Sequence, residues 1–191
     1  MGLSITVFEN VKLVDSYTVC EHDIYDVIFP ENAIHVRKCE YGQFRQFGDL
    51  VDDGMYTYDN SFSLVRIPYS TWSKYRNVMC MKMGLQPTKC DDPYVNMRMS
   101  YIKTMIDMCG DDNSAVFDHS HKHVLLSDLI LHSDCDGFIS TEYCKVIYDD
   151  LLEYERLYYD TNVNDGYNII HDNLKRTFGV ASRTNGIVQF S

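Results

Sequence analysis

Strand-like and helix-like patterns are segregated along this chain, and this segregation limits the folds that the chain can adopt. Five short runs rich in β-branched and aromatic residues, or alternating in polarity, lie at 5–8, 11–14, 24–29, 33–37 and 63–67. Beyond residue 70, apolar side chains recur mainly three and four positions apart. Runs of strands followed by runs of helices indicate an α+β fold rather than an alternating α/β fold. We therefore predict short N-terminal strands forming a small antiparallel sheet, then a mainly helical C-terminal half with a final strand.

Helix boundaries are marked by capping residues, glycines and prolines. Ser70 or Thr71 is expected to cap a helix that stops near Gly84, and Pro93 to begin another that ends at Gly110. Helical spacing also marks the segments 43–50, 124–131, 140–154 and 167–181, and Ser140 is expected to cap the helix over 140–154. A terminal strand is expected at 187–190. No linker or repeat interrupts the 191 residues, so we predict a single domain, residues 1–191.

The chain is acidic, with a formal net charge of −11 and a sequence pI near 4.9. A negative field repels phosphate backbones, so we expect no nucleic-acid partner. No run approaches the roughly 18 apolar residues of a membrane span, so we expect no membrane partner. The same charge suits a host protein with a basic surface.

The seven cysteines are odd in number, and none forms a Cys-x-x-Cys pair. The N-terminus lacks the basic and apolar regions of a secretory signal. These features indicate free thiols in a reducing compartment, so we expect a cytoplasmic protein.

An acidic turn, defined here as residues 132–140 (His-Ser-Asp-Cys-Asp-Gly-Phe-Ile-Ser), is expected to join two helices. It partly matches an EF-hand calcium loop, with Asp134, Asp136 and Gly137 at the third, fifth and sixth positions. His132 and Tyr143 occupy the first and twelfth positions, where that loop needs carboxylates. We therefore favour a structural turn in which Gly137 takes a positive φ.

Two readings that involve histidines also stay open, one at the acidic turn and one upstream of it. The imidazole of His132 beside Asp134 and Asp136 could position a water molecule or bind a cation, as in a metal-assisted hydrolase. His119, His121 and His123 alternate and would point the same way in an extended segment, a pattern suited to a transition metal. Without a separate ligand motif, however, we predict no metal and no cofactor, and the chain contains no nucleophile elbow, P-loop or dinucleotide fingerprint.

Three blocks occur in the same order in a group of hypothetical proteins from bacteria and their phages. They are Tyr-Gly-Gln-Phe-Arg at 41–45, the apolar segment with the acidic turn at 126–137, and Gly-Ile-Val-Gln-Phe at 186–190. The chain resembles this group over well under half its length. The resemblance implies a bacterial or phage cytoplasmic protein and supplies no activity.

Two functions fit these observations best. The first is binding of a small polar ligand, such as a nucleotide signal of a defence system, by Tyr41, Arg45, His132, Asp134 and Asp136. The second is an acidic protein that inhibits a host factor by binding its basic surface. We expect a binding protein rather than an enzyme, and the sequence leaves the oligomeric state open.

Overall fold

The computed structural model describes residues 2–15, 31–36, 54–87, 101, 104–105, 124–132, 137–158 and 166–191. The strands are β1 (Gly2–Glu9), β2 (Lys12–Asp15), β3 (Ala33–Val36), β4 (Gly54–Thr57), β5 (Asn60–Pro68), β6 (Gly137–Ile139) and β7 (Ile187–Phe190). The helices are α1 (Tyr69–Lys82), α3 (Ser127–Leu131), α4 (Thr141–Tyr158) and α5 (Tyr167–Arg183). None of the helices in these ranges is both long and apolar enough to cross a bilayer.

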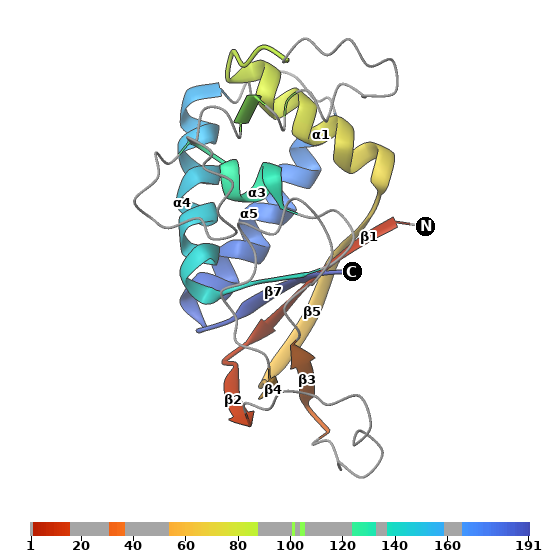
Figure 1. Ribbon diagram of the computed structural model, residues 1–191, viewed down its shortest axis with the longest axis vertical. Coiled ribbons are helices and arrows are strands. Elements are labelled where there is room, and N and C mark those ends of the chain that lie inside the picture. Colours follow the sequence, from red (N-terminus) through yellow and green to blue (C-terminus); the bar gives the residue numbers. More distant parts are fainter. Residues whose placement is uncertain are drawn as a thin grey trace.

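The strands form two antiparallel sheets, and the larger one joins the two ends of the chain. Its order is β5-β1-β7-β6, so the C-terminal strand β7 lies between the N-terminal strand β1 and β6 (Figure 1). The smaller sheet has the order β2-β4-β3. The larger sheet therefore depends on pairing between segments nearly the whole sequence apart.

The two sheets share one bent ribbon of paired strands. β1 pairs with β5 up to Glu9 opposite Asn60, and the pairing resumes where β2 meets β4, with Lys12 opposite Thr57. At the bend Asn10 has a φ of 54°, and its Nδ2 donates to Oδ2 of Asp59 at 2.9 Å. The Asn60 amide donates to the Glu9 carboxylate at 3.1 Å across the same bend. Local side-chain bonds thus fix the bend where one sheet passes into the other.

The two faces of the larger sheet bury different cores. The face with Leu3, Ile5, Val7, Val188 and Phe190 packs against the helices, which lie together on one side of the sheet in Figure 1. The opposite face buries a smaller cluster, composed of Phe8, Val11, Val36, Tyr56, Phe138 and Ile187. The alternation of strand side chains assigns neighbouring residues to opposite faces.

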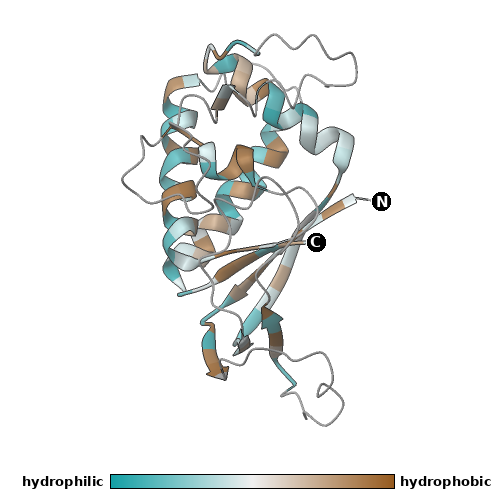
Figure 2. Cartoon of the chain, viewed as in Figure 1, coloured by the Kyte–Doolittle hydropathy of each residue, from teal (hydrophilic) through white to brown (hydrophobic). Residues whose placement is uncertain are grey.

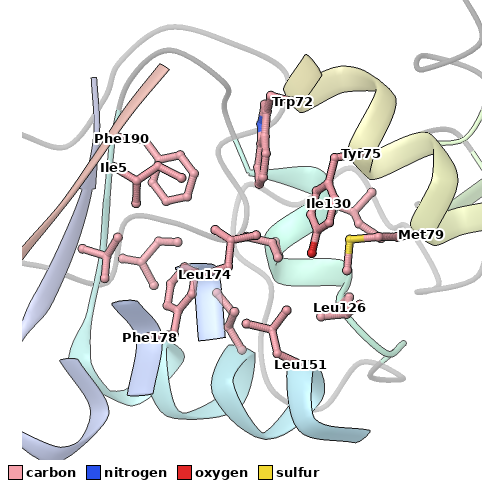
Figure 3. Close-up of a cluster of buried hydrophobic side chains, with 14 of the residues drawn as sticks. Ile5, Trp72, Tyr75, Met79, Leu126, Ile130, Leu151, Leu174, Phe178 and Phe190 are labelled. Atoms are coloured by element: carbon pink, nitrogen blue, oxygen red, sulfur yellow. The ribbon is translucent and has the colours of Figure 1, made fainter. Parts of the chain in front are cut away.

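Helices α4 and α5 are amphipathic, and hydrophobic and hydrophilic residues are mixed along both in Figure 2. On α1 the buried side chains follow helical spacing, at Trp72, Tyr75, Arg76, Met79 and Cys80. Figure 3 shows Trp72, Tyr75 and Met79 reaching from α1 toward side chains of α3, α4, α5 and β7. Polar residues also lie on buried helical faces, among them Arg76 on α1, Asp150 on α4 and His171 on α5.

The predicted fold class is confirmed: antiparallel sheets form from the N-terminal strands, helices dominate the C-terminal half, and the chain ends in a strand. Two details differ from expectation. Helix α1 begins at Tyr69, with Pro68 in the cap position. Proline is tolerated there because it lacks a backbone N–H, and the start of a helix needs none. Ser140 precedes α4 as expected, yet its buried Oγ makes no hydrogen bond within the described ranges, so its side chain does not cap the helix. The expected elements at 24–29 and 43–50 lie outside the described residues.

Candidate functional site

The two described ends of the acidic turn lie side by side in the core. His132 follows α3 and is only 3% exposed, and Gly137 begins β6. The sequence predicted that the turn joins two helices directly. This prediction is wrong, because a strand lies between α3 and α4. The last residues of the turn form this strand, with Gly137 paired to Phe190 and Ile139 to Val188. This pairing ties the turn to the C-terminus, which helical spacing on either side of the turn could not reveal.

Phe190 and Gly137 both lie against the imidazole of His132. The His132 and Phe190 ring centroids are 4.4 Å apart. A Cβ atom added to Gly137 would lie 3.4 Å from both Cε1 and Nε2 of His132. Gly137 has a φ of 121°, so the prediction of a positive φ is confirmed. Both ends of the turn are thus held by specific backbone and ring contacts.

Replacing Gly137 with alanine should lower the free energy of unfolding by about 1–3 kcal/mol, because an L-residue is strained at this φ. Urea denaturation provides the measurement. The matched control is Gly84→Ala, at a φ of 76° with open space around the added methyl group. We expect a smaller loss for Gly84→Ala, because its φ lies near the left-handed helical region that an L-residue can adopt. An equal loss would mean that the φ of 121° at Gly137 adds no further strain.

Helix α3, which leads into the acidic turn, is tied at both ends by buried charged side chains. At its start Leu126 has a φ of 61°, and its backbone N–H donates to Oδ2 of Asp150 on α4 at 2.6 Å. At its end Nη1 of Arg76 on α1 donates to the carbonyl oxygens of Ile130 and His132, at 3.1 and 2.9 Å. The Asp150 carboxylate therefore accepts from a backbone N–H at the start of the helix, and the Arg76 guanidinium donates to carbonyl oxygens at its end. Helix ends need such partners, because their terminal backbone groups have none within the helix.

A second buried polar cluster joins α1, α4 and α5 behind the site. The Tyr75 hydroxyl lies 3.1 Å from Nδ1 of His171, which is 1% exposed. The His171 ring also packs against Tyr154, with centroids 5.5 Å apart. These contacts join three helices, so their effect falls on packing.

Burial lowers the pKa of His171 below its usual value of 6.5, because the core disfavours the imidazolium form. The Glu155 and Asp172 carboxylates and a hydrogen bond with the Leu151 backbone oppose this shift, while Lys175 adds to it. Nζ of Lys175 lies 2.7 Å from Oε2 of Glu155 and 3.5 Å from Oδ1 of Asp172. The effects of these three charges on His171 therefore partly cancel.

Stability should therefore fall as the pH drops below about 6.5, where His171 of the unfolded chain begins to take up a proton that the folded chain resists. Above that pH the imidazole is neutral in both states and contributes no pH dependence. The measurement is the free energy of unfolding across this range. His171→Gln should flatten the acid limb, and an unchanged limb in this variant would contradict the assignment.

The described cysteines are not nucleophiles. Cys80 and Cys144 are both fully buried free thiols, as the sequence predicted for the cysteines. Burial raises the pKa of Cys80 to about 12 and raises the pKa of Cys144 as well. Since the thiolate is the reactive form, neither side chain can serve covalent catalysis near neutral pH.

Of the predicted ligand-binding residues, His132 lies among the described residues. Its placement is the one given above, buried against Phe190. The others, Tyr41, Arg45, Asp134 and Asp136, lie outside the described residues, as do His119, His121 and His123. The predicted set therefore stays a prediction.

Sequence reasoning missed Arg76 and Asp150, the residues that tie α3. The available signal was helical spacing, because Arg76 lies four residues after Trp72 and three before Met79, on a stripe of core residues. A charged residue on such a stripe requires a buried partner. The pattern does not reveal that the partners are carbonyl oxygens at the end of α3, 54 and 56 residues away.

Across the ranges that the structure describes, no three His, Cys, Asp or Glu residues are grouped so that they could hold a metal ion. Comparison with known proteins gives no match to a family model, a curated protein or a solved structure.

Proposed function

We propose that this chain is a cytoplasmic bacterial or phage protein that binds a small polar ligand, a nucleotide, at the acidic turn. In this proposal Arg45 pairs with a phosphate, Tyr41 stacks on the base, and Asp134 and Asp136 accept hydrogen bonds from ribose or base. His132 anchors the turn beneath the ligand. In a phage, such a protein would sequester a nucleotide defence signal.

The observation that carries the proposal is the fixation of His132 and Gly137. Loops that bind ligands are most effective when a rigid scaffold positions their ends, because less conformational entropy is then lost on binding. Here one end is bonded through Arg76 and the other is paired in the sheet with Phe190. The residues between them in the sequence include both aspartates and no large side chain.

Isothermal titration calorimetry of the full chain against linear and cyclic nucleotides tests this proposal. We expect at least one nucleotide to bind with a dissociation constant of about 1 μM or lower, equivalent to about −8 kcal/mol. Arg45→Ala and Asp134→Asn should each weaken that binding at least about tenfold. Arg176→Ala, which removes an exposed arginine on α5, is the control for loss of charge. Absence of heat with every nucleotide, or equal affinities in all variants, would reject the proposal.

A second candidate is inhibition of a host protein through the α4–α5 pair. Its support is the exposure of three large apolar side chains on these helices, with Leu152 at 41%, Leu157 at 47% and Ile169 at 64%. Together with the charge of −11, they suit a partner whose basic surface includes an apolar patch. Crosslinking in host lysate at low salt should place a partner on α4 or α5, and Ile169→Asp should remove it. Recovery of no partner at low salt would exclude this function.

A further inference from the structure

Four buried side chains close a ring of contacts at the base of the acidic turn. The Arg76 guanidinium carbon lies 5.0 Å from the centroid of the Trp72 ring, and the Trp72 and Phe190 centroids are 6.1 Å apart. Phe190 packs on the imidazole of His132, whose carbonyl oxygen accepts a hydrogen bond from Arg76. All four residues are 3% exposed or less. We call Trp72, Arg76, His132 and Phe190 the collar.

The collar contacts both ends of the turn at once. Arg76 bonds the backbone of His132 at one end, and Phe190 is paired in the sheet with Gly137 at the other. Trp72 lies between Arg76 and Phe190 and so links the two supports. A change in either end of the turn must therefore be transmitted to the environment of the indole.

The use of an arginine in the collar is informative because burying a guanidinium is costly unless it is well hydrogen-bonded. An apolar side chain would fill the same space and could not bond the carbonyl oxygens of Ile130 and His132. A lysine could reach these oxygens only as a point charge, without the fixed geometry of the guanidinium fork. The arginine therefore specifies where the backbone at the end of α3 lies, which packing alone does not.

We infer that Arg76 is the positioning residue of the acidic turn, and that Trp72, the single tryptophan of the chain, is a built-in reporter of the state of the turn. Arg76 acts through the backbone of the turn rather than by contact with a ligand. It fixes the backbone of His132, and the collar carries that constraint to Gly137. The inference rests on the proposed function for its ligand-binding consequence, whereas the positioning itself is measurable without a ligand.

Native-state deuterium exchange of the full chain tests the positioning. In Arg76→Met, amides of peptides that contain His132 and Gly137 should exchange at least about tenfold faster, a difference of about 1.4 kcal/mol. Arg76→Lys should fall between Arg76→Met and the wild type. Peptides from α5 serve as the internal reference, and Arg176→Met is the control variant. An equal acceleration in α5, or no acceleration near the turn in Arg76→Lys, would overturn the inference.

Trp72 emission provides the second readout. Acrylamide should quench Trp72 more strongly in Arg76→Lys than in Arg176→Lys, while both variants keep the far-ultraviolet circular dichroism of the wild type. ATP and cyclic AMP are then titrated separately, and a nucleotide that binds should alter Trp72 emission and bind Arg76→Lys about tenfold more weakly. If neither nucleotide binds the wild type, the proposed function loses support while exchange still decides the role of Arg76. Equal quenching in the two variants would contradict the reporter role.

Discussion

Replacing Phe190 with alanine should lower the free energy of unfolding by about 3–5 kcal/mol, a large part of the 5–15 kcal/mol that stabilises a typical domain. Phe190 is fully buried on β7, where it contacts Trp72 and His132. Its removal leaves a cavity between the sheet and the helices, because both neighbours are held by other contacts and cannot fill the space. Equilibrium denaturation in urea, with the slope compared between variants, provides the measurement.

Two variants separate this cavity from a general sensitivity of β7. Phe190→Leu keeps most of the volume and should lose clearly less than Phe190→Ala. Gln189→Ala alters the neighbouring side chain, which is half-buried on the other face of the strand, and should change stability by about 0.5 kcal/mol or less. A loss of similar size in Gln189→Ala would show that strand propensity, rather than the core, is responsible.

Gly186→Ala should cost about 3 kcal/mol, at the upper end of the range for overpacking. A Cβ atom at this position would lie 2.6 Å from the Phe8 carbonyl oxygen and 3.1 Å from the Cα of Ala181. Both obstacles are backbone atoms, so no side-chain rotation can relieve the contact. Gly186 itself is fixed on both sides, since its N–H donates to Ala181 and its carbonyl accepts from Thr141.

The measurement is again urea denaturation, with thermal unfolding as a second probe of Gly186→Ala. Gly166→Ala is a suitable control, because nothing lies within 4 Å of the added methyl group there. In that control only the φ of 75° is unfavourable for alanine, so the free energy of unfolding should fall by about 1–2 kcal/mol. Wild-type stability in Gly186→Ala would mean that the end of α5 moves away from β1 without cost.

The acidic turn illustrates how far local sequence reasoning extends. Its glycine predicts a positive φ, because the turn needs a residue without a Cβ, and Gly137 has one. The same residues did not predict β6, since a strand of three residues has no measurable periodicity. Its partner is β7, about 50 residues later, and strand pairing at that separation is a tertiary choice.

The sequence by itself determined the α+β class, the extent of the terminal strand at 187–190 and the helices at α4 and α5. Each of these depends on side-chain period and capping, which are properties of neighbouring residues. Only the tertiary structure decided that β7 lies between β1 and β6, and that Arg76 and Asp150 hold the two ends of α3. Those arrangements depend on which buried groups find partners across the core, and a buried donor selects its acceptor by geometry that sequence spacing does not encode.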